Sequence, residues 1–206
     1  MTTRPRLLIA SANRGKVAEY RELLQGVECE LLSLRDAGID GDVAETGTSY
    51  AENACIKAVT CAARSGFVTL ADDSGLEVEA LGGEPGIYSA RYAGDGATDA
   101  ERVAFLLKKL EAVPSERRGA RFVCVIALAT PDGEVTYCRG ECYGRIVTEP
   151  RGARGFGYDP AFLLPERGVT MAELPPEEKN RVSHRGRAAA LARDVIRGFI
   201  DAGRCR

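Results

Sequence analysis

The chain has 206 residues, of which 45% are hydrophobic and 28% are charged. A chain of this length and composition can bury a sizeable core, as one domain or as two lobes that share a core. Its net charge of −2 argues against a general nucleic-acid-binding protein, which usually carries a basic excess.

No export or membrane segment stands out in the sequence. The first apolar run, Leu7–Ala10, is too short for a signal peptide, and no run reaches the roughly 20 apolar residues of a membrane span. The seven cysteines form no Cys-x-x-Cys pair, and the only histidine is His184, so a zinc site is disfavoured. We therefore expect a cytoplasmic protein with reduced thiols and no membrane partner.

The N-terminal part of the chain begins with a predicted strand over residues 6–11 (RLLIAS). A polar turn leads from this strand into a helix over residues 17–25, and Gly26 is suited to end that helix. Residues 31–42 have no clear pattern.

The second predicted helix begins at a capping box formed by Ser49 and Glu52 and runs to Arg64. A short apolar strand follows over residues 67–71, and we expect it to end on the polar run 72–75.

The remaining predicted elements again mix strands and helices, which favours an α/β fold with a mixed sheet. A glycine-rich loop over residues 82–96, with some local order, precedes them. They are helices over 98–110 and 183–202, and strands over 121–130, 135–146 and 162–164.

The turn from Ser11 to Lys16 is a candidate anion site. Backbone N–H groups at a helix N-terminus attract anions, and Lys16 adds a positive charge, so phosphate is the natural ligand. The turn lacks the first glycine of a P-loop and the hydroxyl residue after the lysine. The alternative is an ordinary turn with a surface lysine.

Two adjacent aspartates follow the strand predicted over residues 67–71. Neighbouring side chains of an extended chain point to opposite faces, so one of Asp72 and Asp73 is expected to face a ligand. A carboxylate there, together with Glu45, would suit Mg²⁺, which takes oxygen ligands and binds phosphates. Asn53 and Lys57 share one face of the preceding helix. The alternative is an Asp-rich turn beside a solvated helix.

Two further segments suit a nucleoside. Residues 155–160 (GFGYDP) place two aromatic rings among glycines, where they could either pack into the core or stack on a base. Residues 179–185 place His184 among basic residues at a helix start. The alternative for the second segment is a capped, exposed helix N-terminus.

Together these segments resemble the inosine/xanthosine triphosphate pyrophosphatase family, whose motifs occur in order over nearly the whole chain. Ser49 and Tyr50 stand where Thr and Phe are expected, and both changes are conservative. The matching motifs are Ser11-x-Asn13-x-x-Lys16, Glu45 to Ala58, Ala71 to Leu76 with Pro85 to Tyr92, Gly155 to Pro160, and Lys179 with Ser183 to Arg185.

The resemblance implies hydrolysis of non-standard purine nucleoside triphosphates (ITP, dITP, XTP) to the monophosphate and pyrophosphate. It implies a single domain over residues 1–206, with a mixed twisted sheet, flanking helices, and two lobes around a long central cleft. It also implies a homodimer that uses Mg²⁺ and forms no stable complex with nucleic acid.

The resemblance also implies residue roles. Glu45 and Asp73 would hold the metal, and Asp73 is the candidate base for water. Arg185, which can only donate, would face the 6-keto group of the base, and Phe156 would stack on it. The phosphates would be held by Ser11, Asn13, Lys16 and Lys57, and the nucleoside by Ser74, Phe156, Gly157, Tyr158, Asp159, Lys179, His184 and Arg185.

Two alternatives remain open at this point. One is a Maf-like nucleotide pyrophosphatase with another base preference, although the motif Ser183–Arg185 favours the inosine type. The other is a nucleotide- or RNA-binding module without catalysis. Glu45 and Asp73 argue against it, because bare carboxylates repel phosphates unless a metal intervenes.

Overall fold

The structure is a computed structural model that describes residues 4–41 and 43–205. The chain divides into two compact units. The first unit comprises residues 1–73, 124–140 and 185–206, and the second comprises residues 74–123 and 141–184. The ends of the predicted domain, residues 1–3 and 206, and Asp42 of the ambiguous segment lie outside the described residues.

The described strands form one sheet in the order β2-β1-β3-β4-β5-β6-β7. Strand β1 pairs in parallel with β2 and β3, whereas β6 pairs antiparallel with β5 and β7. The sheet is therefore mixed, and the predicted α/β class is confirmed. The strands are β1 (Arg6–Ile9), β2 (Glu30–Ser33), β3 (Val68–Val78), β4 (Gly119–Ala129), β5 (Val135–Ile146), β6 (Phe162–Leu164) and β7 (Val169–Thr170).

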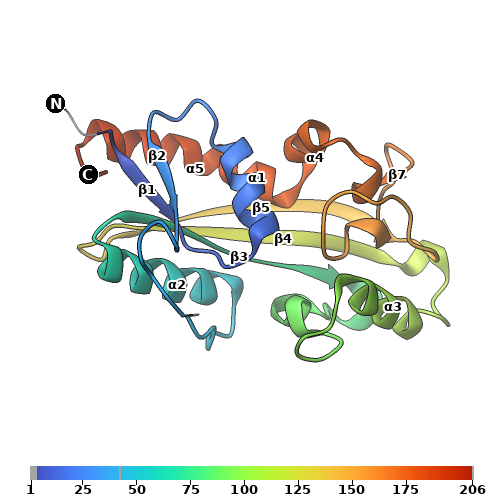
Figure 1. Cartoon of the computed structure of the whole chain (residues 1–206). Coiled ribbons are helices and arrows are strands. Elements are labelled where there is room, and N and C mark those ends of the chain that lie inside the picture. The colour runs from blue at the N-terminus through green and yellow to red at the C-terminus, as the bar shows by residue number, and fades with distance from the viewer. Residues whose placement is uncertain (1–3, 42, 206) are drawn as a thin grey trace. The chain divides into compact units, whose positions relative to one another are not determined.

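The described residues also form α-helices, which Figure 1 labels, and short 3-10 helices. Among the described residues, no helix combines the length and hydropathy that a membrane span requires. The α-helices are α1 (Arg14–Leu23), α2 (Tyr50–Ser65), α3 (Asp99–Lys109), α4 (Pro176–Val182) and α5 (His184–Asp201). The short 3-10 helices are η1 (Glu79–Leu81), η2 (Gly86–Arg91), η3 (Ser115–Arg117), η4 (Asp159–Ala161) and η5 (Met171–Glu173).

The first unit has helices on both faces of its strands (Figure 1). Because side chains alternate along a strand, Leu7 and Ile9 of β1 pack with α1 and α5, whereas Leu8 packs against α2. Small residues of α2, including Ala54 and Ala58, are fully buried and let this helix approach the sheet closely.

The predicted ends of α2 are confirmed. Ser49 is the N-cap, and its side chain accepts a hydrogen bond from Glu52 N at 3.2 Å. Gly66 ends the helix in the left-handed conformation, with φ of 71°. The reciprocal half of the box differs, because the Glu52 carboxylate accepts from Thr48 N and Thr48 Oγ1 rather than from the N-cap residue.

Strand β3 does not end on the two aspartates, as the sequence predicts, but spans 11 residues and continues to Val78. Leu76 and Val78 are fully buried in the core of the second unit, so apolar contacts hold the chain extended beyond Asp73. The two aspartates therefore lie within a strand, and their side chains point in opposite directions.

The second unit has a core of its own. Val103 and Leu106 of α3, with Leu110 at its C-cap, pack with Phe122 of β4 and Phe162 of β6. The predicted capping box of Thr98 and Glu101 is present in full at the start of α3. Helix α4 and the two-residue strand β7 were not predicted.

Candidate active site

The turn between β1 and α1 is held by hydrogen bonds to the side chains of its own residues. Ser11 Oγ accepts a hydrogen bond from Asn13 N at 3.2 Å, and Asn13 Oδ1 accepts from Lys16 N at 3.1 Å. Asn13 is thus the N-cap of α1. The cap fixes the start of the helix and with it the backbone from which the Lys16 side chain extends.

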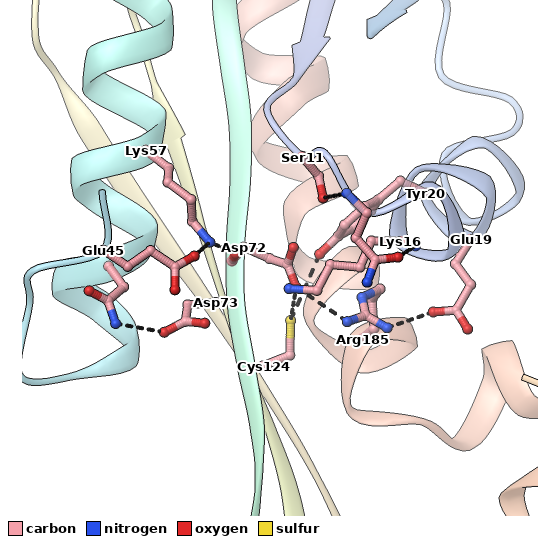
Figure 2. A network of polar contacts seen from close by, with 12 residues as sticks. Ser11, Lys16, Glu19, Tyr20, Glu45, Lys57, Asp72, Asp73, Cys124 and Arg185 are labelled. Atoms are coloured by element: carbon pink, nitrogen blue, oxygen red, sulfur yellow. Dashed lines mark hydrogen bonds and ion pairs between the residues drawn. The ribbon is translucent and has the colours of Figure 1, made fainter. Parts of the chain in front are cut away.

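The Lys16 ammonium forms an ion pair with Asp72, whose carboxylate is almost fully buried (Figure 2). Lys16 Nζ lies 3.0 Å from Asp72 Oδ2, and Arg185 Nη2 lies 3.3 Å from the same oxygen. Burial opposes the charge of Asp72, but Lys16, Arg185 and Lys57 outweigh it and hold the pKa of this carboxyl well below its usual range. Asp72 is therefore an ionised anchor for two cations.

Arg185 is buried between two carboxylates. Its Nη1 donates to Glu19 Oε2 at 2.6 Å, and its Nη2 donates to Asp72, while the side chain is only 2% exposed. The Cys124 thiol lies 3.8 Å from Asp72 Oδ2, and burial raises the pKa of that thiol to about 12. Contact of Arg185 with a base stays a prediction, because the structure directs its guanidinium into this network.

Asp73 points to the other side of β3, toward α2 (Figure 2). Its Oδ2 accepts a hydrogen bond from Asn53 Nδ2 at 3.0 Å. Burial raises the pKa of Asp73; Lys57 and the Asn53 hydrogen bond oppose that shift, and Glu45 adds to it. Asp73 therefore holds a proton more tightly than an ordinary aspartate and lies near a second carboxylate.

Lys57 bridges the Glu45 side chain and the backbone of β3. Its Nζ donates to Glu45 Oε1 at 2.6 Å and to the backbone oxygen of Asp72 at 2.6 Å. Burial opposes its charge, but Asp72 and Glu45 outweigh burial and raise the pKa of Lys57. The ammonium is thus positively charged and fixed, and a third N–H is available to a further acceptor.

The two carboxylates Glu45 and Asp73 suit a magnesium ion that completes its coordination with other oxygens. Mg²⁺ is usually bound through one or two carboxylates plus substrate phosphates rather than by an all-protein cage. Within residues 4–41 and 43–205 there is no cluster of three or more His, Cys, Asp or Glu residues that could hold a metal. The donor set therefore fits Mg²⁺ bound together with a phosphate ligand.

The second unit holds the other predicted residues. Lys179 Nζ donates to Asp159 Oδ2 at 2.5 Å and lies 4.9 Å from the centroid of the Phe156 ring. Asp159 Oδ2 also accepts from Phe156 N at 2.9 Å. A Cβ on Gly155, whose φ is 75°, would lie 2.1 Å from that same oxygen, so glycine is required there.

Tyr158, His184 and Ser74 have different surroundings. The Tyr158 ring is 4% exposed and belongs to the core, so of the two alternatives for this ring the structure supports packing rather than stacking on a base. The His184 ring stacks on Phe122, with centroids 4.6 Å apart. Ser74 is half-buried on β3, directly after Asp73.

The predicted residues divide between the two units. Ser11, Asn13, Lys16, Glu45, Lys57, Asp73 and Arg185 belong to the first unit, and Ser74, Phe156, Gly157, Tyr158, Asp159, Lys179 and His184 to the second.

The predicted set omitted three supporting residues. Asn53 had a signal, its position one helical turn before Lys57, and its Oδ1 also accepts from Gly47 N at 2.8 Å. Glu19 and Asp99 had none, because their partners Arg185 and Gly157 lie 166 and 58 residues away along the chain.

Comparison with known proteins gives a consistent result. The profile of the Ham1 family matches residues 7–195. A dITP/XTP pyrophosphatase of Geobacter sulfurreducens is 51% identical over 191 residues, covering 93% of this chain and 96% of that protein. One of Geobacillus kaustophilus is 51% identical over 182 residues, covering 88% and 89%.

Solved structures agree with these relatives. A HAM1 protein from Coxiella burnetii has a TM-score of 0.85 and 44% identity, covering 93% of this chain and 98% of that one. The Staphylococcus aureus Ham1 protein has a TM-score of 0.83 and 40% identity, covering 94% and 98%. The resemblance drawn from the sequence motifs is confirmed, and the Maf-like alternative is disfavoured. The chain belongs to the Ham1 family.

Proposed function

We propose that this chain is a pyrophosphatase of nucleotide metabolism that hydrolyses non-canonical purine nucleoside triphosphates to the monophosphate and pyrophosphate. The observation that carries this function is the 51% identity, over 93% of the chain, to a protein named dITP/XTP pyrophosphatase. The predicted motif residues in both units are consistent with it.

In this proposal the first unit binds the triphosphate and carries out the chemistry. Lys16 and Lys57 are held by Asp72 and Glu45 at positions fixed before substrate arrives, and each ammonium has a further N–H for a phosphate oxygen. Their charge stabilises the pyrophosphate leaving group as the bond between its bridging oxygen and the α-phosphorus breaks.

Asp73 is the proposed general base. Its carboxylate takes a proton from the water whose oxygen forms the new bond to the α-phosphorus. Glu45 and Asp73 would hold Mg²⁺, which when bound polarises phosphate oxygens and neutralises their charge. Asn53 keeps the Asp73 carboxylate oriented.

The residues of the second unit bind the nucleoside in this proposal. Phe156 supplies an aromatic ring. Asp159 holds the backbone N–H of Phe156, and the Lys179 ammonium lies over the ring. Stacking on an aromatic ring holds any purine and does not distinguish one base from another. Ser74, Tyr158 and His184 support this region, and the choice of a 6-keto purine is assigned to donors such as Arg185.

The test is pyrophosphate release from ITP, dITP, XTP, GTP and ATP, with Mg²⁺ and then with excess EDTA. We expect pyrophosphate and monophosphate from the first three, very little from ATP, and loss of all release with EDTA. Asp73→Asn, purified in parallel, is the matched control for contaminating phosphatases. Release of orthophosphate, or equal rates with ITP and ATP, would contradict the proposal.

We further propose that the two compact units of each chain act as one pyrophosphatase domain, and that the protein is a cytoplasmic homodimer. Light scattering coupled to size-exclusion chromatography tests the dimer directly, and a monomeric mass at micromolar concentration would contradict it.

A further inference from the structure

The loop that carries Phe156 is held by two hydrogen bonds. One goes to Asp99 in the first turn of α3, and the other to Ser89, which precedes α3. Asp99 Oδ2 accepts a hydrogen bond from Gly157 N at 2.7 Å, and Tyr158 Oη donates to the backbone oxygen of Ser89 at 2.9 Å. Ser89 is itself fixed, because its Oγ accepts from Leu76 N at 2.9 Å. Both anchors lie within the second unit.

The two hydrogen bonds to consecutive peptide N–H groups determine how Phe156 is presented. Phe156 N donates to Asp159, which belongs to the loop itself, whereas Gly157 N donates to Asp99, which comes from another element. Gly157 has φ of 61°, a conformation that glycine adopts without strain. The Asp99 hydrogen bond therefore fixes the peptide plane that follows Phe156. Together with the Asp159 bond it fixes the backbone from which the aromatic ring extends.

Asp99 is well placed for this task because its own side chain is held. The Arg102 guanidinium pairs with Asp99 Oδ1, and its Nη1 donates to the backbone oxygens of Ala90, at 3.0 Å, and Ala97. Asp99 is also the first residue of α3, where a carboxylate is favoured by the helix dipole. Its acceptor oxygen is thus oriented before any ligand binds.

We propose that Asp99 is a positioning residue for base binding, which acts by holding the Gly157 amide and through it the Phe156 ring. The inference rests on the proposed function, since it assigns Phe156 to the purine. It gives a role to a carboxylate of the second unit that lies outside the motifs matched in the sequence.

The test compares Asp99→Ala with Asp99→Asn, and uses Glu101→Ala as the matched control on the same helical turn. Glu101 belongs to the capping box of α3, so its loss weakens the helix but leaves the Gly157 hydrogen bond intact. An asparagine oxygen can still accept from Gly157 N, whereas alanine cannot.

We expect Asp99→Ala to raise the KM for ITP about tenfold with little change in kcat, as loss of one charge-assisted hydrogen bond allows. Asp99→Asn should recover most of this loss, and Glu101→Ala should leave KM unchanged. The inhibition constant of inorganic tripolyphosphate, which has no base, should be the same in all three variants. Equal KM values for Asp99→Ala and wild type, or a parallel change for tripolyphosphate, would overturn the assignment.

Amide hydrogen exchange of Gly157, measured by NMR, separates this inference from the proposed function. Exchange at Gly157 should accelerate in Asp99→Ala and stay slow in Asp99→Asn. If wild-type protein releases no pyrophosphate from ITP, the proposed function fails, and the role in base binding fails with it even where the Gly157 effect is seen. If ITP is hydrolysed but Gly157 exchanges equally in all variants, only the positioning role fails.

Discussion

Replacing Asp72 with asparagine should destabilise the protein strongly, although the two side chains have almost the same shape. The Asp72 side chain is 1% exposed and accepts from Lys16 at 3.0 Å and Arg185 at 3.3 Å. The neutral amide would remove the carboxylate charge that buried Arg185 and half-buried Lys16 share. Removing one partner of a buried ion pair costs about 3–5 kcal/mol.

For a chain of this size, each kcal/mol shifts Tm by about 2–4 °C, so the expected decrease is about 6–20 °C. Asp194→Asn is the matched control, because it removes the same charge from an exposed pair with Arg197. Thermal unfolding at pH 7 should show no measurable shift for this control. Equal Tm values for the Asp72 and Asp194 variants would refute the role of Asp72 as an anchor.

The pH dependence provides a second test of the same anchor. The pKa of Asp72 is lowered in the folded protein, so its contribution to stability is complete above the unfolded-state pKa of about 3.9 and declines as the pH falls below that value. The difference in Tm between wild type and Asp72→Asn should therefore be constant near neutral pH and shrink in acid. A difference that grows as the pH falls below about 4 would contradict this assignment.

Three further predictions concern catalysis and selectivity. Asp73→Asn should lower kcat by about 10²–10⁴-fold or more while leaving Tm nearly unchanged. Lys16→Ala should raise the KM for ITP in steady-state kinetics, because a phosphate oxygen loses its partner. It should also lower Tm, because buried Asp72 loses one of its two paired cations. Arg185→Ala should lower Tm, because Asp72 and Glu19 lose a shared partner. It should also reduce the ratio of kcat/KM for ITP to that for ATP; an unchanged ratio would assign Arg185 to the buried network alone.

Local signals in the sequence predicted the elements that depend on local interactions. The helix from Tyr50 to Ser65 was predicted because a serine cap and a left-handed glycine enclose it, and both are present. Strand β5 was predicted at its observed bounds. Helix α4 was missed because Pro175 and Pro176 look like helix breakers, although proline is favoured in the first turn of a helix.

Partners that are distant along the chain were not predictable in the same way. Two adjacent aspartates indicated the end of a strand, since an ionised carboxylate inside a sheet is costly without a partner. The partners come from α1, α2 and α5, in the form of Lys16, Asn53 and Arg185. With these contacts made, the strand continues through both aspartates to Val78.

Because β3 continues past them, the pKa values of the two neighbouring carboxyl groups shift in opposite directions. Because β3 stays extended, Asp72 and Asp73 face opposite sides of the sheet (Figure 2). Burial disfavours the charge of both groups. At Asp72 the cations Lys16, Arg185 and Lys57 outweigh burial and lower the pKa, whereas at Asp73 burial prevails and the pKa is raised. Two titratable groups whose environments separate their pKa values are a guide to acid–base roles. The separation supports the proposal that Asp72 serves as a structural charge and that Asp73 is the group that accepts a proton. A strand that ended at Asp72 would lose this division, because a turn does not force neighbouring side chains onto opposite faces.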